Sequence, residues 1–222
     1  MLYIVETYGA MLLRSLGQTI LLTLLSLLFA MIIGLIFALM NVGRSRILNF
    51  IGTLYVDAVR GVPLIVLAYF IYFGIPAGIK SMGIQDFRLS ALQAGTIALA
   101  MNCGAYMAEI IRAGIESVDK GQMEASRSLG LSYGKSMRLV VLPQAIRTMI
   151  PSIINQFIIT LKDTSILSVI AFPELTNTGK TIAGNTFKVL ETWTIVGLMY
   201  MIVIITLSKI AKRIERRVNR GR

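Results

Sequence analysis

The sequence predicts an all-α membrane protein that has five transmembrane helices and short cytoplasmic helices in one long polar loop. Of its 222 residues, 55% are hydrophobic, which is more than a soluble domain of this length usually carries, because many of its residues must face water. The apolar residues form long runs, and basic residues that give a net charge of +11 lie between and after them. This arrangement is typical of transmembrane helices and their flanks.

A helix needs about 20 apolar residues to cross a bilayer. Five runs approach this length, at residues 17–40, 51–74, 89–111, 150–171 and 193–208. The longest connection, at residues 113–147, is polar and joins the third run to the fourth. We therefore expect residues 1–222 to form a single transmembrane domain.

The first run, at residues 17–40, is rich in leucine on all sides, so we expect its helix to contact lipid. The stretch 3–13 before it is apolar but short, and we expect it to lie along the membrane interface. No basic residue stands between Met1 and Ala10, so this end lacks the positively charged start of a secretory signal peptide. The first run is therefore expected to remain in the protein as a span.

The second run, at residues 51–74, is interrupted by charges and by a helix breaker. Asp57 and Arg60 lie inside it, and Gly61-Val62-Pro63 follows them. Pro63 has no backbone N–H to donate, and it disfavours helical geometry at the residue before it. At membrane depth such a break is stable only where protein or a water-filled cavity satisfies the freed carbonyl groups.

The third and fourth runs have features of helices inside a bundle. The third is dense in alanine and glycine, and small residues let helix backbones approach closely. It also contains Asn102 and Glu109, while the fourth contains Lys162 and Asp163. The fifth ends in a basic tail, residues 209–222, which we expect to bind anionic membrane lipid.

The distribution of basic residues predicts the orientation of the chain. Cytoplasmic loops of membrane proteins carry an excess of lysine and arginine. Besides the tail, the excess here comprises Arg44, Arg46, Lys120, Arg127, Lys135, Arg138 and Arg147. The loops on the opposite side mix acidic residues with Lys80, Arg88, Lys180 and Lys188. We therefore expect the polar loop and the C-terminus in the cytoplasm and the N-terminus outside.

Local signals divide the polar loop into two short helices. Gly130 fits the C-terminal cap of a helix that ends near Leu129, and Ser132 fits the N-terminal cap of the next one. Pro143 suits the first turn of the following span, where its missing N–H removes no intrahelical hydrogen bond. The loop is therefore expected to form a compact knob outside the bilayer.

The residue inventory excludes several functional classes. The chain has no histidine and a single cysteine, Cys103, so it offers no internal disulfide, no imidazole for a catalytic triad and no multi-cysteine zinc site. No G-x-x-x-x-G-K-[ST] phosphate loop is present, so we do not expect this chain to hydrolyse ATP. We expect no enzymatic activity, no cofactor, no metal and no nucleic-acid partner.

The polar loop carries a spaced motif. Glu124-Ala125-Ser126 is followed after three residues by Gly130, and after nine more by Val140-x-Leu142-Pro143. The pattern resembles the EAA loop of bacterial ABC-importer permeases, which reads E-A-A, three residues, G, nine residues, I-x-L-P. In that family the loop is the cytoplasmic coupling element that docks into the ATPase subunit. The coupling residues that the resemblance implies are Glu124, Ala125, Ser126, Leu129, Gly130 and Leu131.

The segments around this loop extend the resemblance over residues 55–175 and narrow it to the polar amino-acid branch of these permeases. That branch shows R-G-x-P-L, A-Y-x-A-E-x-x-R-x-G-I, G-Q-x-E-A, L-P-Q-A and K-D-T-S, which stand here at residues 60–64, 105–115, 121–125, 142–145 and 162–165. The branch often has a glutamine soon after the first motif, where this chain has Leu67-Ala68. A role for that glutamine is therefore not expected here.

The resemblance implies the membrane subunit of an ATP-driven importer of polar amino acids in the bacterial plasma (inner) membrane. By the same resemblance, a cytoplasmic ATPase dimer binds ATP and Mg²⁺ and docks at the loop, and an extracytoplasmic solute-binding protein delivers the amino acid. Five spans are too few to enclose a path, so we expect a second permease copy or a homologue beside this chain. The sequence leaves homodimer and heterodimer open.

Ionisable side chains inside the spans mark a candidate substrate path. A charge at the centre of a transmembrane helix costs at least about 2.5 kcal/mol, so such residues face the bundle interior or water. Three carboxylates outnumber two cations among them, which favours a cationic amino acid such as arginine, lysine or histidine. The full candidate set is Asp57, Arg60, Tyr69, Asn102, Met107, Glu109, Lys162, Asp163 and Ser165.

The same residues also fit structural roles. Asp57 stands three residues before Arg60, a spacing at which side chains meet on a helix. Lys162 has Asp163 and Glu109 as possible partners for an ion pair. The asparagine of the third run fits a hydrogen bond between helices, the commoner role of such a residue.

Two other classes of function stay open on the sequence alone. A secondary transporter or channel subunit, driven by an ion gradient, would use Asp57, Glu109 and Asp163 as proton or cation sites. A membrane scaffold without transport activity would use the polar loop only to dock a protein. The secondary transporter leaves the pattern from Glu124 to Pro143 unexplained. Co-purification of this chain with an ATPase would favour an ATP-driven importer over it.

Overall fold

The computed structural model describes residues 1–43 and 45–219, and of residues 214–219 the backbone alone. Every element in this part of the chain is a helix. Five helical segments are long and apolar enough to cross a membrane: Leu2–Val42, Leu64–Ser81, Ala91–Glu116, Tyr133–Ile170 and Val189–Arg213. The predicted all-helical class with five candidate spans is therefore confirmed. Arg44, Arg220 and Arg222 of the predicted basic segments lie outside the described residues.

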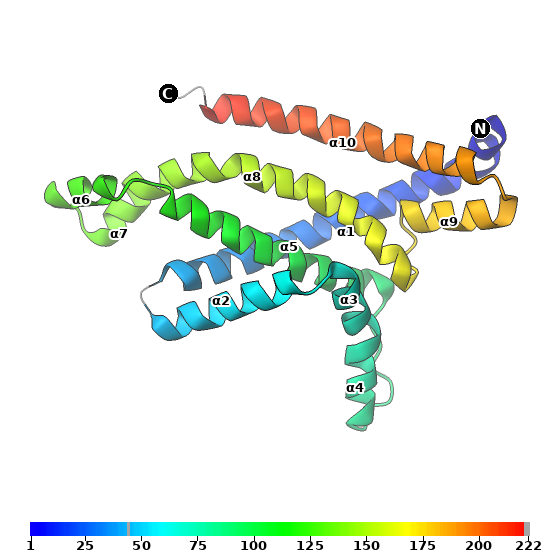
Figure 1. Ribbon diagram of the computed structural model, residues 1–222, viewed down its shortest axis with the longest axis horizontal. Helices are drawn as coiled ribbons and strands as arrows, with labels where there is room; N and C mark the ends of the chain where they lie inside the picture. Colours follow the sequence, from blue (N-terminus) through cyan, green and yellow to red (C-terminus); the bar gives the residue numbers. More distant parts are fainter. Residues whose placement is uncertain (44, 220–222) are drawn as a thin grey trace.

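Helix α1 (Leu2–Val42) runs along most of the molecule, short of α6 and α7, and packs along helix α5 (Ala91–Glu116), as Figure 1 shows. The two backbones approach closely where glycine stands at the contact. A Cβ atom on Gly34 of α1 would lie 2.5 Å from the Cβ of Met107 of α5. Helix α5 is the most buried of the five candidate spans, as its small residues predict.

The apolar stretch 3–13 continues helix α1 without a break, so it is not the separate interfacial segment that we expected. Ile4 and Leu12 are buried in a cluster with Leu175 and Ile182. These partners lie far away in the sequence. Packing against them, which the composition of the stretch does not reveal, keeps the first turns in one helix with the span.

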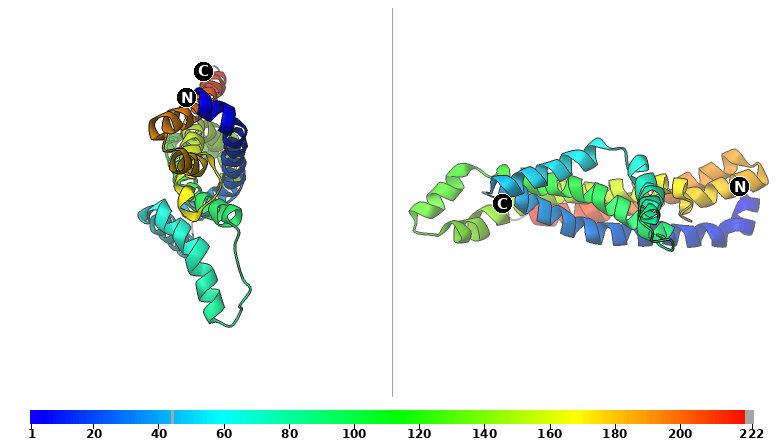
Figure 2. Two further views of the ribbon diagram at one scale, coloured as in Figure 1. Left: turned by 90° about the vertical axis from the view of Figure 1, so that its right-hand side faces the viewer. Right: turned by 90° about the horizontal axis from the view of Figure 1, so that it is seen from below.

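Four helical segments replace the predicted second span: α2 (Arg46–Gly61), α3 (Leu64–Tyr69), a π-helical turn (Phe70–Gly74) and α4 (Ile75–Ser81). Pro63 separates the first two, and Val62 before it is extended, with φ −102° and ψ 129°. Helices α3 and α4 then turn away from the bundle (Figures 1 and 2). The segment here that is long and apolar enough to cross a membrane is Leu64–Ser81. The run 51–74 is therefore not one continuous helix, because the proline redirects the chain and does not merely kink one helix.

The polar loop folds into the predicted pair of short helices. In order, the elements are α6 (Lys120–Ser128), α7 (Tyr133–Ser136), a π-helical turn (Met137–Val141) and α8 (Leu142–Asp163). Ser132 caps α7, since its Oγ accepts a hydrogen bond from the N–H of Lys135 at 3.5 Å, and Pro143 lies in the first turn of α8. Helices α6 and α7 extend beyond the bundle at one end, as the predicted knob requires (Figure 1).

A helix that the sequence did not predict lies between the last two spans. The 3₁₀ turn after α8 leads into α9, and α10 follows; their bounds are Thr164–Ile170, Leu175–Thr186 and Val189–Asn219. The side chain of Glu174 starts α9 by accepting hydrogen bonds from the N–H groups of Thr176, at 2.7 Å, and Asn177, at 2.5 Å. The N–H of Leu175 donates to Thr19 Oγ1 of α1 at 3.1 Å, which fixes α9 against the bundle.

Buried apolar side chains in the middle of the molecule hold the break between α2 and α3 in place. Val59 and Leu64, one on each side of the break, pack in one cluster with Leu22 of α1, Leu99 of α5 and Leu167 of the 3₁₀ turn. The three surrounding elements thus anchor the interrupted helix. A pocket lined partly by Leu64 opens beside this anchor.

Candidate functional site

A pocket of about 510 Å³, hereafter the central pocket, opens where α2 gives way to α3. Its lining is Arg60, Gly61, Val62, Pro63, Leu64, Asn102, Tyr106, Gln156, Ile159, Asp163 and Ile166. The helix break therefore borders a cavity, which is the setting in which an interrupted helix is stable at membrane depth. Arg60, Asn102 and Asp163 of the predicted substrate path meet here.

The charged groups of the central pocket come from different helices. Arg60 lies in the last turn of α2, where the helix dipole favours a cation, and its guanidinium carbon is 5.2 Å from the centre of the Tyr106 ring. Asp163, partly buried, is the last residue of α8. Asn102 and Gln156 add two buried amides. The pocket therefore presents a cation, an anion and amide groups within one cavity.

A second cavity, of about 320 Å³, lies nearer the polar loop, between the end of α1, helix α2 and helix α5. It is hereafter the polar chamber, and its lining is Asn41, Asn49, Thr53, Val56, Asp57, Arg60, Glu109, Arg112 and Glu116. All of these side chains except Val56 are polar or charged. Arg60 lines both this chamber and the central pocket, so the two cavities adjoin at its side chain.

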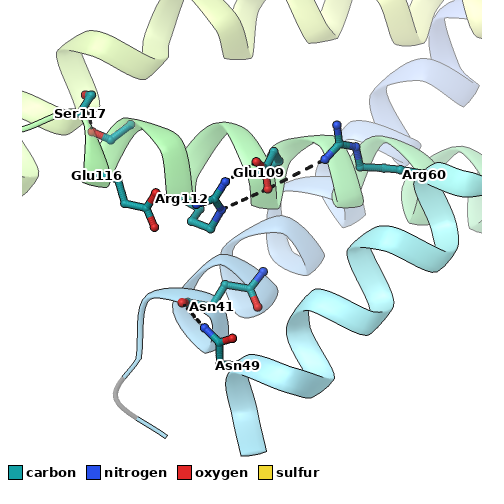
Figure 3. A network of polar contacts seen from close by, with 8 residues as sticks. Asn41, Asn49, Arg60, Glu109, Arg112, Glu116 and Ser117 are labelled. Carbon is teal, nitrogen blue, oxygen red and sulfur yellow. Dashed lines mark hydrogen bonds and ion pairs between the residues drawn. The ribbon is translucent and has the colours of Figure 1, made fainter. Parts of the chain in front are cut away.

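Helix α5 supplies a row of alternating charges to the polar chamber (Figure 3). Arg112 donates from Nη1 to Glu116 Oε2 at 2.6 Å and from Nε to Glu109 Oε2 at 3.2 Å. Nη1 of Arg60 lies 3.9 Å from Glu109 Oε2, too far for a hydrogen bond. Arg112 is thus bound to two carboxylates, while Arg60 is held by one long ion pair and by the Tyr106 ring.

The turn between α6 and α7 has a defined hydrogen-bond pattern. The N–H of Leu131 donates to the carbonyl of Ser126 at 3.3 Å, and the N–H of Gly130 donates to the carbonyl of Arg127 at 3.0 Å. Together with the φ of +85° at Gly130, these bonds form a Schellman motif, which satisfies carbonyl groups at a helix end. The predicted coupling residues therefore stand on a closed, rigid turn.

The predicted coupling residues differ in their exposure on the knob. Leu129 is 85% exposed, and Glu124 and Ala125, five and four residues before it, are exposed as well. Ser126 is buried instead, and its hydroxyl donates to the carbonyl of Met123 at 2.9 Å. The serine that replaces the usual alanine of the motif thus faces the inside of the knob.

Comparison with known protein families identifies the family of this chain. The family described as the binding-protein-dependent transport system inner membrane component matches residues 10–220, nearly the whole chain. The chain belongs to this family. The permease is thus a multi-pass inner-membrane protein and the non-catalytic membrane component of an ABC transporter. In such systems a partner ATPase handles ATP, and a binding protein serves the permease.

Curated relatives and a solved structure support the resemblance that the motifs indicated. The permease is 36% identical over 208 residues to the glutamine transport system permease protein GlnP of Escherichia coli (strain K12), which covers 94% of this chain and 93% of that one. It is 33% identical over 206 residues to the arginine transport system permease protein ArtQ of Bacillus subtilis (strain 168), covering 93% and 91%. A crystal structure of an amino acid ABC transporter with histidines matches with a TM-score of 0.89 and 38% identity over 97% of each chain.

Five of the nine predicted substrate-path residues line the two adjoining cavities of the permease. Arg60, Asn102 and Asp163 line the central pocket, and Asp57 and Glu109 join Arg60 at the polar chamber. Arg60 has its ion pair with Glu109 and none within 4.0 Å with Asp57. The alternative in which Asp57 and Arg60 neutralise each other is therefore not what the structure shows.

The other four predicted residues lie elsewhere in the permease. Lys162 and Ser165 line a separate pocket beside α10, so Lys162 and its sequence neighbour Asp163 serve different cavities. Tyr69 is exposed on α3, and its ring stands 5.9 Å from that of Phe73. Met107 is fully buried in the contact between α1 and α5. These four residues lie within the predicted spans, as the pocket residues do. Their side chains are directed elsewhere, and they therefore do not line the central pocket.

Sequence reasoning missed Tyr106 and Gln156 of the central pocket. Tyr106 follows Asn102 by four residues, and Gln156 precedes Asp163 by seven. These are spacings at which residues share one face of a helix. Both residues could have been found from the sequence, by looking for polar side chains on the same helix face as Asn102 and Asp163. Among the side chains described, those of residues 1–43 and 45–213, no cluster of three or more His, Cys, Asp or Glu residues is arranged to hold a metal ion.

Proposed function

We propose that this permease carries a polar amino acid across the inner membrane through the central pocket, with ATP hydrolysis in a partner ATPase as the driving force. The observation that carries the proposal is that Arg60 and Asp163 line one cavity. A guanidinium suits an α-carboxylate, and a carboxylate suits an α-ammonium group, since charge-assisted hydrogen bonds are the strongest available. Asn102 and Gln156 supply amides for a polar side chain.

The finer proposal is a cationic amino acid, namely arginine, lysine or histidine. The central pocket and the polar chamber together carry four carboxylates, on Asp57, Glu109, Glu116 and Asp163, but two guanidinium groups, on Arg60 and Arg112. This excess of negative charge favours a substrate with an additional positive charge. The relative named for arginine transport supports the same choice.

The assembly we propose has residues 1–222 as one transmembrane domain, paired with a second copy or a homologue. The polar loop and the C-terminus face the cytoplasm and the N-terminus faces outside, because the basic residues gather on one side. An ATPase dimer docks at α6 and α7, a solute-binding protein docks on the opposite side, and the basic tail contacts anionic lipid. Transport requires that the ATPase bind two conformations of the pair with different free energies.

Uptake by the reconstituted complex tests this function. The permease, its ATPase and its binding protein are placed in lipid vesicles, and the twenty amino acids compete for uptake of labelled arginine. We expect ATP-dependent uptake that ionophores do not abolish, with arginine, lysine or histidine competing best. Asp163→Asn should raise the KM about tenfold or more, which corresponds to a loss of about 1.4 kcal/mol of binding free energy.

The matched control is Asp86→Asn, because Asp86 is an exposed carboxylate in the loop between α4 and α5. An unchanged KM and rate in Asp163→Asn would reject the central pocket as the substrate site. Uptake that collapses with an ion gradient and ignores ATP would reject the ATP-driven importer. Best competition by an uncharged amino acid would reject only the cationic preference.

A further inference from the structure

We propose that the polar chamber is a second, exit-side binding site for the transported amino acid and that Arg60 passes the substrate carboxylate into it from the central pocket. The inference rests on the proposed function, because it names the place that the substrate occupies next. It assigns roles to Asn41 and Asp57, which the central pocket leaves unused. Its ligand class is an amino acid with free α-ammonium and α-carboxylate groups.

Arg60 is placed for such a transfer. Its side chain lines both cavities and keeps 37% of its surface exposed. Its ion pair with Glu109 is long, at 3.9 Å, and a partly exposed pair of this kind contributes little to stability. Its other contact is the face of the Tyr106 ring, whose centre is 5.2 Å from the guanidinium carbon. A turn of the guanidinium between a carboxylate in the central pocket and one in the polar chamber therefore breaks no hydrogen bond within the described part of the chain.

The polar chamber holds groups that have no partner inside the protein. Asp57 has no cation within 4.0 Å and no hydrogen bond among the described residues, so a carboxylate on the chamber wall is available to an ammonium group. Asn41 is 9% exposed, and its Oδ1 lies beside Gly52 without a hydrogen-bond partner in the described part of the chain. A buried amide without a partner costs free energy. Asn41 is one of the residues that line the chamber.

The remaining charges define what fits. Arg112 is occupied by Glu109 and Glu116, so it closes one wall and leaves Arg60 as the available cation. Asp57 and Arg60 then offer one anion and one cation, which match the two α-groups of an amino acid. The volume of about 320 Å³ falls within the range of about 300–1,000 Å³ typical of small-molecule sites.

Stoichiometry of binding tests the inference. The permease–ATPase complex is purified without nucleotide, and binding of labelled arginine, and in parallel of labelled glutamine, is measured by equilibrium dialysis. We expect the wild-type complex to bind more than one amino acid per permease chain. Asp57→Asn should lose the second equivalent and keep the first, whereas Asp163→Asn should lose the first. Asp86→Asn should bind as the wild type does.

Unfolding does not explain such a loss, because Asp57 is exposed and has no partner to lose; the melting temperature of Asp57→Asn should equal that of Asp86→Asn. A single equivalent in the wild type, unaffected by Asp57→Asn and lost in Asp163→Asn, overturns the second site and leaves the proposed function standing. Binding that Asp163→Asn does not alter overturns the proposed function instead. Failure of both amino acids to bind overturns both.

Discussion

The hydroxyl of Tyr200 donates a hydrogen bond to the carboxylate of Glu174 at 2.9 Å, and so ties α10 to the start of α9. Glu174 is fully buried and also receives the N–H groups of Thr176 and Asn177. A carboxylate that accepts three hydrogen bonds away from water is satisfied only while all three donors keep their places. The Glu174 carboxylate therefore helps to set the orientation of α9, together with the hydrogen bond from Leu175 to Thr19.

Removing the Tyr200 hydroxyl should destabilise the contact between α10 and the start of α9. We expect Tyr200→Phe to lower the free energy of unfolding by about 1–3 kcal/mol, because the buried Glu174 carboxyl group loses a hydrogen-bond donor. The measurement is the thermal midpoint of the purified permease in detergent. Tyr8→Phe is the control, since the Tyr8 hydroxyl makes no hydrogen bond to the described side chains and backbone of residues 1–43 and 45–213. Equal midpoints for the two variants would show that the bond contributes nothing.

Glu174 should also make stability depend on pH. Burial raises the pKa of its carboxyl above the ordinary value, while the hydrogen bonds from Thr176, Asn177 and Tyr200 oppose this shift without cancelling it. A carboxyl with a higher pKa in the folded state binds more protons there than in the unfolded state. Its contribution to stability is thus fully present below the unfolded pKa of about 4.3 and is lost as pH rises through the folded pKa.

The pH profile of a variant isolates this contribution. The thermal midpoint of the wild type should fall with rising pH, from pH 4 towards neutrality, relative to that of Glu174→Gln, which has no proton to release. The absolute midpoint of the variant is not the readout, since glutamine also loses hydrogen bonds as an acceptor. Parallel profiles for the two proteins would contradict the raised pKa.

The contact between α1 and α5 gives a prediction with a control on the same helix. A Cβ on Gly34 would meet the Cβ of Met107 at 2.5 Å, whereas Gly17 has nothing within 4 Å of the same position. We expect Gly34→Ala to lower the free energy of unfolding by about 1–3 kcal/mol through overpacking. Gly17→Ala should be neutral or slightly stabilising, since alanine favours helix over glycine. A midpoint for Gly34→Ala at or above that of Gly17→Ala would mean that the helices separate at no cost.

The features predicted from the sequence were those set by local chemistry. Gly130, Ser132 and Pro143 determine backbone geometry within a few residues of themselves, so the two-helix knob could be derived from the sequence alone. The five apolar segments were also evident from composition. Pro63 was seen as a break, but its consequence was misjudged, because whether a chain kinks or changes direction depends on what the next helix packs against.

The features that escaped prediction depend on partners distant in the sequence. Helix α9 is fixed by the bond from Leu175 to Thr19 and by Tyr200, residues that no local pattern connects. The separation of Lys162 from Asp163 likewise follows from how α8 is rotated in the bundle. Candidate residues were therefore identified by type, while their grouping into cavities needed the structure.

The turn after α6 offers a test of backbone conformation. Gly130 has φ +85°, where a side chain is strained, while Gly134 lies in α7 with nothing within 4 Å of an added Cβ. We expect Gly130→Ala to cost about 1–2 kcal/mol locally, seen as faster hydrogen exchange in residues 120–136 and as weaker stimulation of the partner ATPase. Gly134→Ala should do neither. Exchange rates that are the same in both variants would show that the left-handed turn is not required.

The exposed face of the knob should decide coupling. Leu129 is 85% exposed, and a large apolar side chain held on a rigid turn is the kind of group that a partner buries. We therefore expect Leu129→Asp to abolish uptake and to weaken co-purification of the ATPase, because the charge would lose its hydration inside the partner's groove. Glu124→Lys should abolish uptake as well, by reversing the charge beside the same contact.

Ser126→Ala is the matched control for both variants. Its hydroxyl bonds to the carbonyl of Met123 within α6 and faces inward, so its removal should leave uptake within about twofold, a free-energy change of roughly 0.4 kcal/mol. Leu129→Asp and Glu124→Lys should keep the wild-type thermal midpoint, since Leu129 and Glu124 are exposed. Wild-type uptake in a fully assembled Leu129→Asp or Glu124→Lys complex would place the coupling contact elsewhere on the polar loop, and a large loss in Ser126→Ala would mean that the buried side of the knob transmits the force.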